Sequence, residues 1–206
     1  IVTSHTPLIF TSNDGGVMPA GVLCVSVYLE GQLTDVLGTS SASLYFEAKS
    51  FVPETLPDGN PTGDGVRMVS WQAMDRVANV EAMKSMQVTL DNTAPEAAIT
   101  VPTDGGRIKG NQPIMGTATD DHFDFYSLSY AVTGTSSYIA IDPVGIFNSQ
   151  VAGGDLARWA ASRVPRGNYT LRLLVEDVVR NVTEVTVNLV KGGKAGNLNG
   201  FPVFSF

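Results

Sequence analysis

The sequence contains few of the residues that a catalytic or cysteine-based site needs. Among its 206 residues there are one cysteine and two histidines, His5 and His122. A single cysteine excludes an internal disulfide and a metal site built from several cysteines. Cys24 lies in an apolar run, where we expect a buried, unreactive thiol. Neither histidine stands in a pattern typical of a catalytic triad or a zinc site, so we predict that the chain is not an enzyme.

Basic residues and long apolar runs are also scarce. The net charge is −7, which removes the phosphate attraction that drives nucleic-acid binding, and we expect no nucleic-acid partner. No apolar run is long enough to cross a bilayer, so we expect no membrane insertion. The chain opens on Ile-Val rather than on methionine, and we expect a processed product or a piece of a longer chain. Residues 1–93 have four basic and ten acidic residues, whereas residues 94–206 have nine and ten, so the first half holds most of the excess negative charge.

A repeated motif is the strongest positive signal. Gly65, Asp75 and Asn79 recur 102 residues later as Gly167, Asp177 and Asn181. A period of this length in 206 residues predicts two similar domains of about 100 residues each. We place them at residues 1–93 and 94–191, with the boundary at Asp91-Asn92-Thr93-Ala94-Pro95. We predict a Gly-rich linker and an apolar terminal strand at residues 192–206.

Alternation of apolar and polar residues predicts an all-β fold of antiparallel, half-buried strands. The predicted inward rows are Tyr126, Leu128, Tyr130 and Val132, then Tyr169, Leu171, Leu173 and Val175, then Val185, Val187 and Leu189. Shifting the second row back by 102 residues gives Val69, Trp71 and Ala73, so Trp71 is predicted to be a core residue. Met86, Val88 and Leu90 fit the third row only after a one-residue adjustment, which a bulge or a longer turn in the first copy would explain. The only predicted helical turn is 155–162.

Acidic residues supply the candidate metal site. Asp120, Asp121 and Asp124 follow a predicted strand and could offer oxygen ligands to calcium. The alternative is a solvated turn in which the aspartates bind their own backbone. For Asp75 and Asp177, the asparagine four residues later favours hydrogen bonds to the local backbone, which need no ion.

Two further surfaces are candidates for binding. Trp159, beside Arg158, could stack on a carbohydrate, although it could instead cap the open end of a sandwich. Five arginines between residues 158 and 180 form a mildly basic patch. In an acidic chain this patch fits an acidic neighbouring domain better than a nucleic acid.

Residues 64–95, DGVRMVSWQAMDRVANVEAMKSMQVTLDNTAP, resemble the closing hairpin and exit linker of bacterial immunoglobulin-like repeats. Residues 96–191 resemble a second repeat, through ITVP at 99–102, IMGTATD at 114–120 and YTLRL at 169–173. The glycine usual before the asparagine is replaced by Ala78 and Arg180, which leaves the turn type open. The tail 190–197, VKGGKAGN, is similar to the junction before the shell of secreted RHS (YD-repeat) proteins. The resemblance implies two tandem immunoglobulin-like antiparallel β-sandwich domains.

These features together predict a non-catalytic extracellular module of a bacterial surface or secreted protein, acting as a spacer or docking unit for other domains or subunits. One alternative is a carbohydrate-binding module. A second is a filament subunit in which residues 1–10 or 201–206 complete the sheet of a neighbour.

Overall fold

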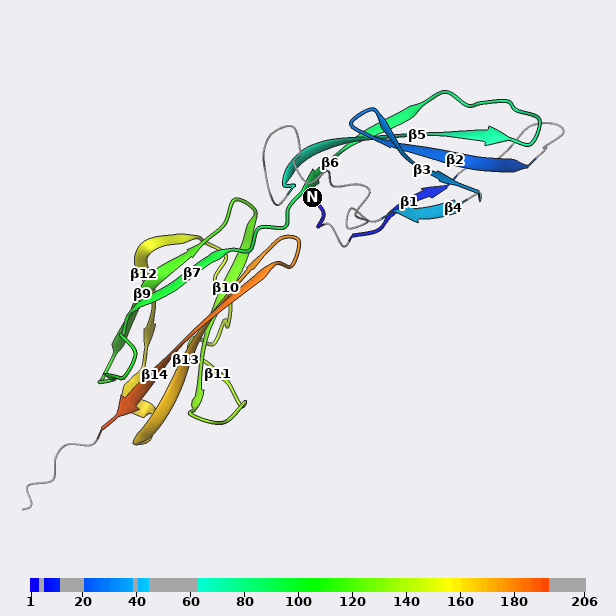
Figure 1. The fold of residues 1–206 in the computed structure, drawn as a ribbon. Helices are drawn as coiled ribbons and strands as arrows, with labels where there is room; N and C mark the ends of the chain where they lie inside the picture. Colours follow the sequence, from blue (N-terminus) through cyan, green and yellow to red (C-terminus); the bar gives the residue numbers. More distant parts are fainter. Residues whose placement is uncertain (4–5, 12–20, 39–40, 45–62, 193–206) are drawn as a thin grey trace, which may run out of the picture. The chain divides into compact units, whose positions relative to one another are not determined.

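The chain folds into two compact units, Ile1–Thr93 and Ala94–Phe206 (Figure 1). The computed structural model describes residues 1–3, 6–11, 21–38, 41–44 and 63–192. His5, most of the predicted linker and the predicted strand at 201–206 lie outside the described residues. None of the described residues forms a helix that is long and apolar enough to cross a lipid bilayer.

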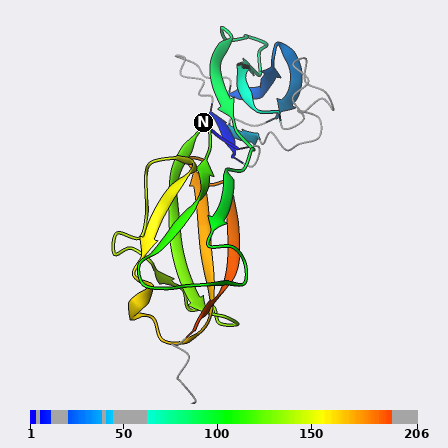
Figure 2. The ribbon, with the colours of Figure 1, turned by 90° about the vertical axis from the view of Figure 1, so that its left-hand side faces the viewer.

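The second unit is a β-sandwich, as the alternation predicts. One sheet has the strand order β12 (Val151–Trp159), β9 (Gln112–Thr119), β7 (Glu96–Val101). The other has the order β11 (Ile139–Ala140), β10 (Phe123–Val132), β13 (Gly167–Asp177), β14 (Val182–Lys191), β8 (Gly106–Arg107). All neighbours are antiparallel except β8 and β14, which run parallel. Figure 2 shows the strands of this unit side by side along their length.

Most residues of the predicted inward rows form the core of the second unit, but Val185 is only half-buried and Val132 is exposed. Tyr169, Leu171, Leu173 and Val175 are all buried on β13, and Val187 and Leu189 are buried on β14. On β10 the row is buried at Tyr126 and Leu128, but Val132 is 54% exposed, so its predicted burial is wrong. Val132 is the last residue of β10, beyond the short strand β11, which pairs only with Ser129 and Tyr130.

The first unit has a four-stranded sheet and a two-stranded sheet. The larger has the order β3 (Gln32–Leu37), β2 (Val22–Leu29), β5 (Gly65–Asp75), β6 (Lys84–Leu90). The smaller pairs β1 (Leu8–Thr11) with β4 (Ser41–Leu44). Trp71 packs against the core of this unit, with its ring centroid 5.3 Å from that of Phe10, so the prediction for Trp71 is confirmed. Leu8–Phe10 belong to the segment that the filament alternative would donate to a neighbour. They lie in β1 and pair with β4 of the same chain.

The two units share a strand arrangement. β5 and β13 have the same length and start 102 residues apart. Each lies between an earlier strand and the last strand of its unit: β5 lies between β2 and β6, and β13 lies between β10 and β14. A parallel segment also joins the last strand in each unit. Val2 bridges Leu90 in the first, and β8 pairs with β14 in the second. The 102-residue repeat therefore marks a repeated fold.

The predicted irregularity in the first copy is a one-residue bulge. Met74 bridges Val80, which is the register found in the second unit. Three residues before Met74 on β5, Trp71 pairs with Lys84, which lies four residues after Val80. The β6 side of the hairpin therefore contains one extra residue. The side chain of Glu81 fills the gap, because its Oε1 accepts the amide of Ala73 at 2.9 Å. The extra residue shifts β6 by one position and accounts for the adjustment. Within the adjusted row Val88 and Leu90 are buried, but Met86 is 45% exposed, so its predicted burial is wrong.

The segment predicted to be a helical turn is mostly a strand. Residues 155–159 complete β12, and only Ala161–Arg163 form a short 3₁₀ helix. The strand forms because β9 supplies backbone partners, with Arg158 opposite Pro113 and Trp159 opposite Gln112. Tertiary pairing overrides the local sequence here.

Candidate functional site: the acidic turns

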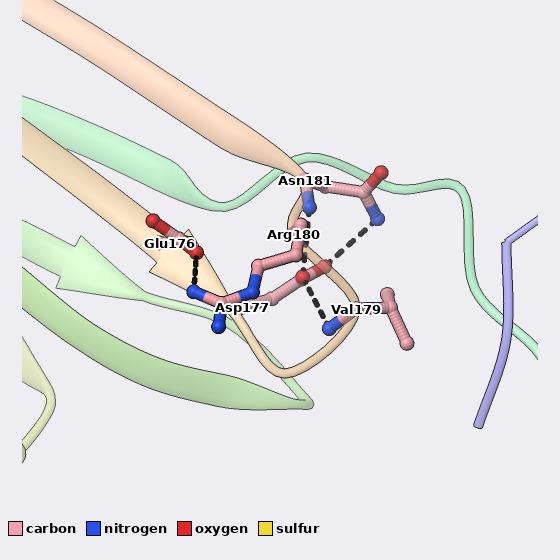
Figure 3. Close-up of polar contacts among 5 residues, drawn as sticks. All are labelled: Glu176, Asp177, Val179, Arg180 and Asn181. Carbon is pink, nitrogen blue, oxygen red and sulfur yellow. Dashed lines mark hydrogen bonds and ion pairs between the residues drawn. The ribbon is translucent and has the colours of Figure 1, made fainter.

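The turn between β13 and β14 is held by one buried carboxylate (Figure 3). Asp177 is fully buried, and its Oδ1 accepts the backbone amides of Val179 at 2.8 Å and Asn181 at 2.9 Å. Its Oδ2 accepts the side-chain amide of Asn181 at 2.8 Å. The backbone closes the same loop, since the Asp177 amide donates to the Asn181 carbonyl at 3.1 Å. Asp177 therefore clamps the turn through its own neighbours.

The first unit contains the same clamp. Asp75 Oδ1 accepts the amides of Val77 at 2.9 Å and Asn79 at 2.8 Å, and Oδ2 accepts the Asn79 side chain at 2.7 Å. The Asp75 amide donates to the Asn79 carbonyl at 2.9 Å. The predicted hydrogen bonds to the local backbone are therefore confirmed in both copies. The two clamps differ in burial, because Asp75 is only half-buried.

The residue before each asparagine has a left-handed backbone. Its φ is 65° at Ala78 and 76° at Arg180. Glycine adopts this conformation without steric cost, and here Ala78 and Arg180 adopt it in place of the usual glycine. The type of turn is therefore the one that glycine would form. Arg180 also forms an ion pair with Glu176, the last residue before the clamp (Figure 3).

The hydrogen bonds of the clamp affect the acidity of Asp75. Partial desolvation by burial raises the pKa of this carboxyl group, but the donors on Asn79 and Val77 lower it, and the net pKa lies below its ordinary value of 3.8. Hydrogen bonds from N–H donors favour the charged form of a carboxylate. The ionised form of Asp75 is thus the one that the turn stabilises.

The predicted calcium residues lie in and after the turn between β9 and β10. Asp120 Oδ1 accepts the backbone amide of His122 at 2.7 Å, and the Asp120 amide donates to Gln150 Oε1 at 3.1 Å. Asp121 is exposed at the tip of the turn, and Asp124 follows on β10. The charge of Asp124 raises the pKa of Arg180, after the larger contribution of Glu176. One of the three carboxylates therefore binds its own turn, and a second interacts with an arginine.

The two acidic turns of the second unit are joined to each other. The amide of Val178, in the Asp177 turn, donates to the His122 carbonyl at 2.9 Å. The end of the sandwich where β9 and β13 finish therefore gathers acidic side chains from both turns, together with Glu96 at the start of β7. We call this surface the acidic end of the second unit; it consists of Glu96, Asp120, Asp121, Asp124 and Glu176, with the buried Asp177 beneath it.

The predicted carbohydrate face is not formed. Trp159 is 2% exposed, and its ring packs on Tyr130 with centroids 4.7 Å apart, so its predicted stacking role is wrong. Arg158 is exposed, because neighbouring residues of a strand point to opposite faces. Trp159 was the candidate platform for a sugar, and in the core it has no free ring face.

Sequence reasoning missed a carboxylate that holds the end of the first unit. Asp64 Oδ1 accepts the backbone amide of Asn92 at 2.8 Å and its side-chain amide at 3.1 Å. Asp64 Oδ2 accepts the hydroxyl of Thr93. The only signal in the sequence was an aspartate directly before Gly65, 28 and 29 residues from its partners. Asp64 therefore fastens the last residues of this unit to the start of β5.

No protein-family model and no curated protein matches the sequence. Among solved structures, the chain is similar to the fibronectin(III)-like modules of Clostridium thermocellum CbhA, with 14% identity, 92% of this chain and 87% of that chain covered, and a TM-score of 0.46. It is also similar to a tetra-tandem repeat in the extending region of a large adhesion protein (17% identity, 92% and 46% covered, TM-score 0.33). A third similar structure is that of the chicken CNTN1 FN1-FN3 domains (9% identity, 90% and 61% covered, TM-score 0.34). The fold assignment rests on the strand pairing within each unit.

Proposed function

We propose that the chain is a non-catalytic spacer or docking module of a larger exported bacterial protein, and that it resists stretching. The proposal rests on one observation, the parallel pairing of an early segment with the last strand in each unit. In the first unit the Val2 amide donates to Thr89 at 2.9 Å, and the Asp91 amide donates to Val2 at 2.9 Å. In the second unit Gly105 donates to Asn188 at 2.7 Å, and Ile108 donates to Val190 at 3.1 Å.

Parallel pairing has a mechanical consequence. When such a pair is pulled from opposite ends, its hydrogen bonds are loaded together along the strand direction instead of opening one after another. The unit therefore resists until several bonds break at once. In the first unit Asp64 adds to this resistance, because it fastens Asn92 and Thr93 just beyond the paired strand.

Stretching the full chain from its two termini in a single-molecule force experiment tests this function. We expect two separate unfolding events, one for each unit. Val2→Pro removes the amide that donates to Thr89 and should lower the force of one event only. Val2→Ala is the matched control, because it shortens the side chain and keeps the amide. Gradual extension at low force, or an unchanged force in Val2→Pro, would show that the chain is not a load-bearing spacer.

A further inference from the structure

One end of the second unit is strongly basic. This is the end where β12 and β14 finish and β13 begins, opposite the acidic end (Figure 1). We call it the basic end; it consists of Arg107, Lys109, Arg158, Arg163, Arg166 and Lys191. Six of the nine basic residues after position 93 therefore gather on one surface.

Backbone pairing brings these residues together from distant parts of the chain. Arg107 on β8 pairs with Val190, and Lys191 pairs with Gly167, directly after Arg166. The 3₁₀ helix that contains Arg163 is tied to the loop after Lys109, because the Ser162 amide donates to the Gly110 carbonyl at 2.9 Å. The six residues therefore come together at the same end of both sheets.

The five-arginine patch predicted from the sequence is not one surface. Arg172 lies in the middle of β13, over the ring of Tyr138 at 3.9 Å and 3.6 Å from Glu184. Arg180 lies at the acidic end, where it pairs with Glu176. Only three of the five arginines belong to the basic end, and three other basic residues complete it.

The positive charge of the basic end is available to a partner. Five of the six side chains are exposed, Lys191 is half-buried, and none of the six makes an ion pair with a described residue. Asp104 is the one described acidic residue near β8, and its Oδ1 already accepts the Asn188 amide at 2.6 Å. Like charges gathered without counter-charges attract an anionic partner.

The surroundings of the charges favour a protein partner over an anionic polymer. Val190, next to Lys191 and paired with Arg107, is 37% exposed, and exposed Val132 ends β10 at the same end. Protein interfaces combine apolar contacts with a polar rim, and arginine is enriched in them. The chain leaves the sandwich here, because β14 ends at Lys191.

We propose that the basic end is a docking surface for a carboxylate-rich face of another protein domain. The inference rests on the proposed function, since it identifies the chemistry of the partner that a docking module would hold. The four arginines can each bind a carboxylate through two hydrogen bonds. The exposed side chains of Val132 and Val190 supply the apolar contacts to the partner domain.

Fluorescence anisotropy of the full chain with two probes of equal charge tests the proposal. The probes are labelled poly-L-glutamate and labelled inorganic polyphosphate. We expect poly-L-glutamate to bind, with an affinity that falls as salt rises. The double variant Arg163→Glu/Arg166→Glu should weaken this binding at least tenfold. Arg163→Gln/Arg166→Gln, which only removes the charges, should give an intermediate loss, and thermal unfolding checks that both variants fold.

The matched control is Arg76→Glu/Lys84→Glu, which makes the same change in net charge on exposed residues of the first unit. It should change the affinity less than twofold. An equal loss in the control, or no binding of poly-L-glutamate, would overturn the proposal. Tenfold tighter binding of polyphosphate would overturn it in favour of a phosphate-polymer site. These outcomes are independent of the force experiment, so the docking surface and the spacer function can fail separately.

Discussion

Arg67 and Tyr169 stand 102 residues apart and hold the same corner of their units by different chemistry. The Tyr169 hydroxyl donates to the carbonyl of Pro165, four residues upstream, at 3.0 Å. Arg67 Nη2 donates to the carbonyl of Gly63, also four residues upstream, at 2.8 Å, and to that of Asp64 at 2.9 Å. A tyrosine at this position is a hallmark of immunoglobulin-like sandwiches, where it ties the start of a strand to the preceding loop. In the first unit a buried arginine replaces it.

The corner can be tested by substitution in both units. Tyr169→Phe removes one hydrogen bond and should cost about 1 kcal/mol of unfolding free energy. Arg67→Lys should cost more, about 1 to 3 kcal/mol, because one ammonium group cannot reproduce the guanidinium geometry. Urea unfolding of the full chain, followed by the fluorescence of Trp71 and Trp159, assigns each loss to its unit. A lysine variant as stable as the native chain would show that Arg67 does not hold the corner.

The two aspartate clamps should differ in their contribution to stability. Asp177 is itself fully buried, and Asp177→Ala leaves three donors on the half-buried residues Val179 and Asn181 without their acceptor, so it should cost about 2 to 4 kcal/mol. Asp177→Asn keeps one acceptor oxygen and should cost less. Asp75→Ala should have a smaller effect than Asp177→Ala, because Asp75 is only half-buried and the donors on the exposed residues Val77 and Asn79 can bind water instead. Urea midpoints measure the three variants, and equal losses at both positions would contradict the role assigned to burial.

Acid should weaken the first clamp. The pKa of Asp75 is lowered in the folded chain, so the unfolded chain binds a proton more readily at this site. Its contribution to stability is therefore present above the ordinary value of 3.8 and is lost as the pH falls through the lower folded-state pKa. Carboxyl NMR titration of Asp75 should give a pKa below 3.8. In Asn79→Ala, which removes the side-chain donor, that pKa should rise, and an unchanged value would contradict the assignment.

One glycine of the second unit should tolerate no side chain. A Cβ at Gly116 would lie 1.9 Å from the carbonyl oxygen of Ala98 on β7, and backbone cannot move aside as a side chain can. Gly116→Ala should therefore cost about 3 kcal/mol. Its cross-strand partner Gly154 is the matched control, because a Cβ there meets only a side-chain atom of Val151, at 3.2 Å. Similar losses in the two variants, measured by thermal unfolding, would argue against a backbone clash at Gly116.

Asp120, Asp121 and Asp124 should not bind calcium at millimolar concentrations. Asp120 already accepts the His122 amide, and Asp124 acts on Arg180. We expect the melting temperature of the full chain to stay constant up to millimolar calcium. Binding at a hundredfold excess over the dissociation constant would instead stabilise the unit by about 2.7 kcal/mol. A rise that Asp121→Asn/Asp124→Asn abolishes would restore the calcium site.

Features that depend on neighbouring residues could be predicted from the sequence. The row Leu171, Leu173 and Val175 follows from alternation alone, and the clamps follow from an aspartate and an asparagine four residues apart. Trp159 was misplaced because a short apolar segment fits a helix or a strand equally well, and its partner Gln112 decided the outcome from 47 residues away. The Asp64 contacts were missed and the basic end was predicted only in part for the same reason, since the fold joins residues that are far apart in sequence.

The bulge at residues 80–84 absorbs an added residue between the Asp75 clamp and the regular pairing of β5 with β6. The bulge disturbs neither the Asp75 clamp nor the strand pairing. The clamp keeps its four hydrogen bonds, and Val88 and Leu90 on β6 remain buried. Ala82 and Met83 are exposed. Exposed loop positions of this kind accept foreign segments more readily than paired strands do. This hairpin is therefore the place to graft an epitope or a fluorophore-labelling tag without unfolding the unit that displays it.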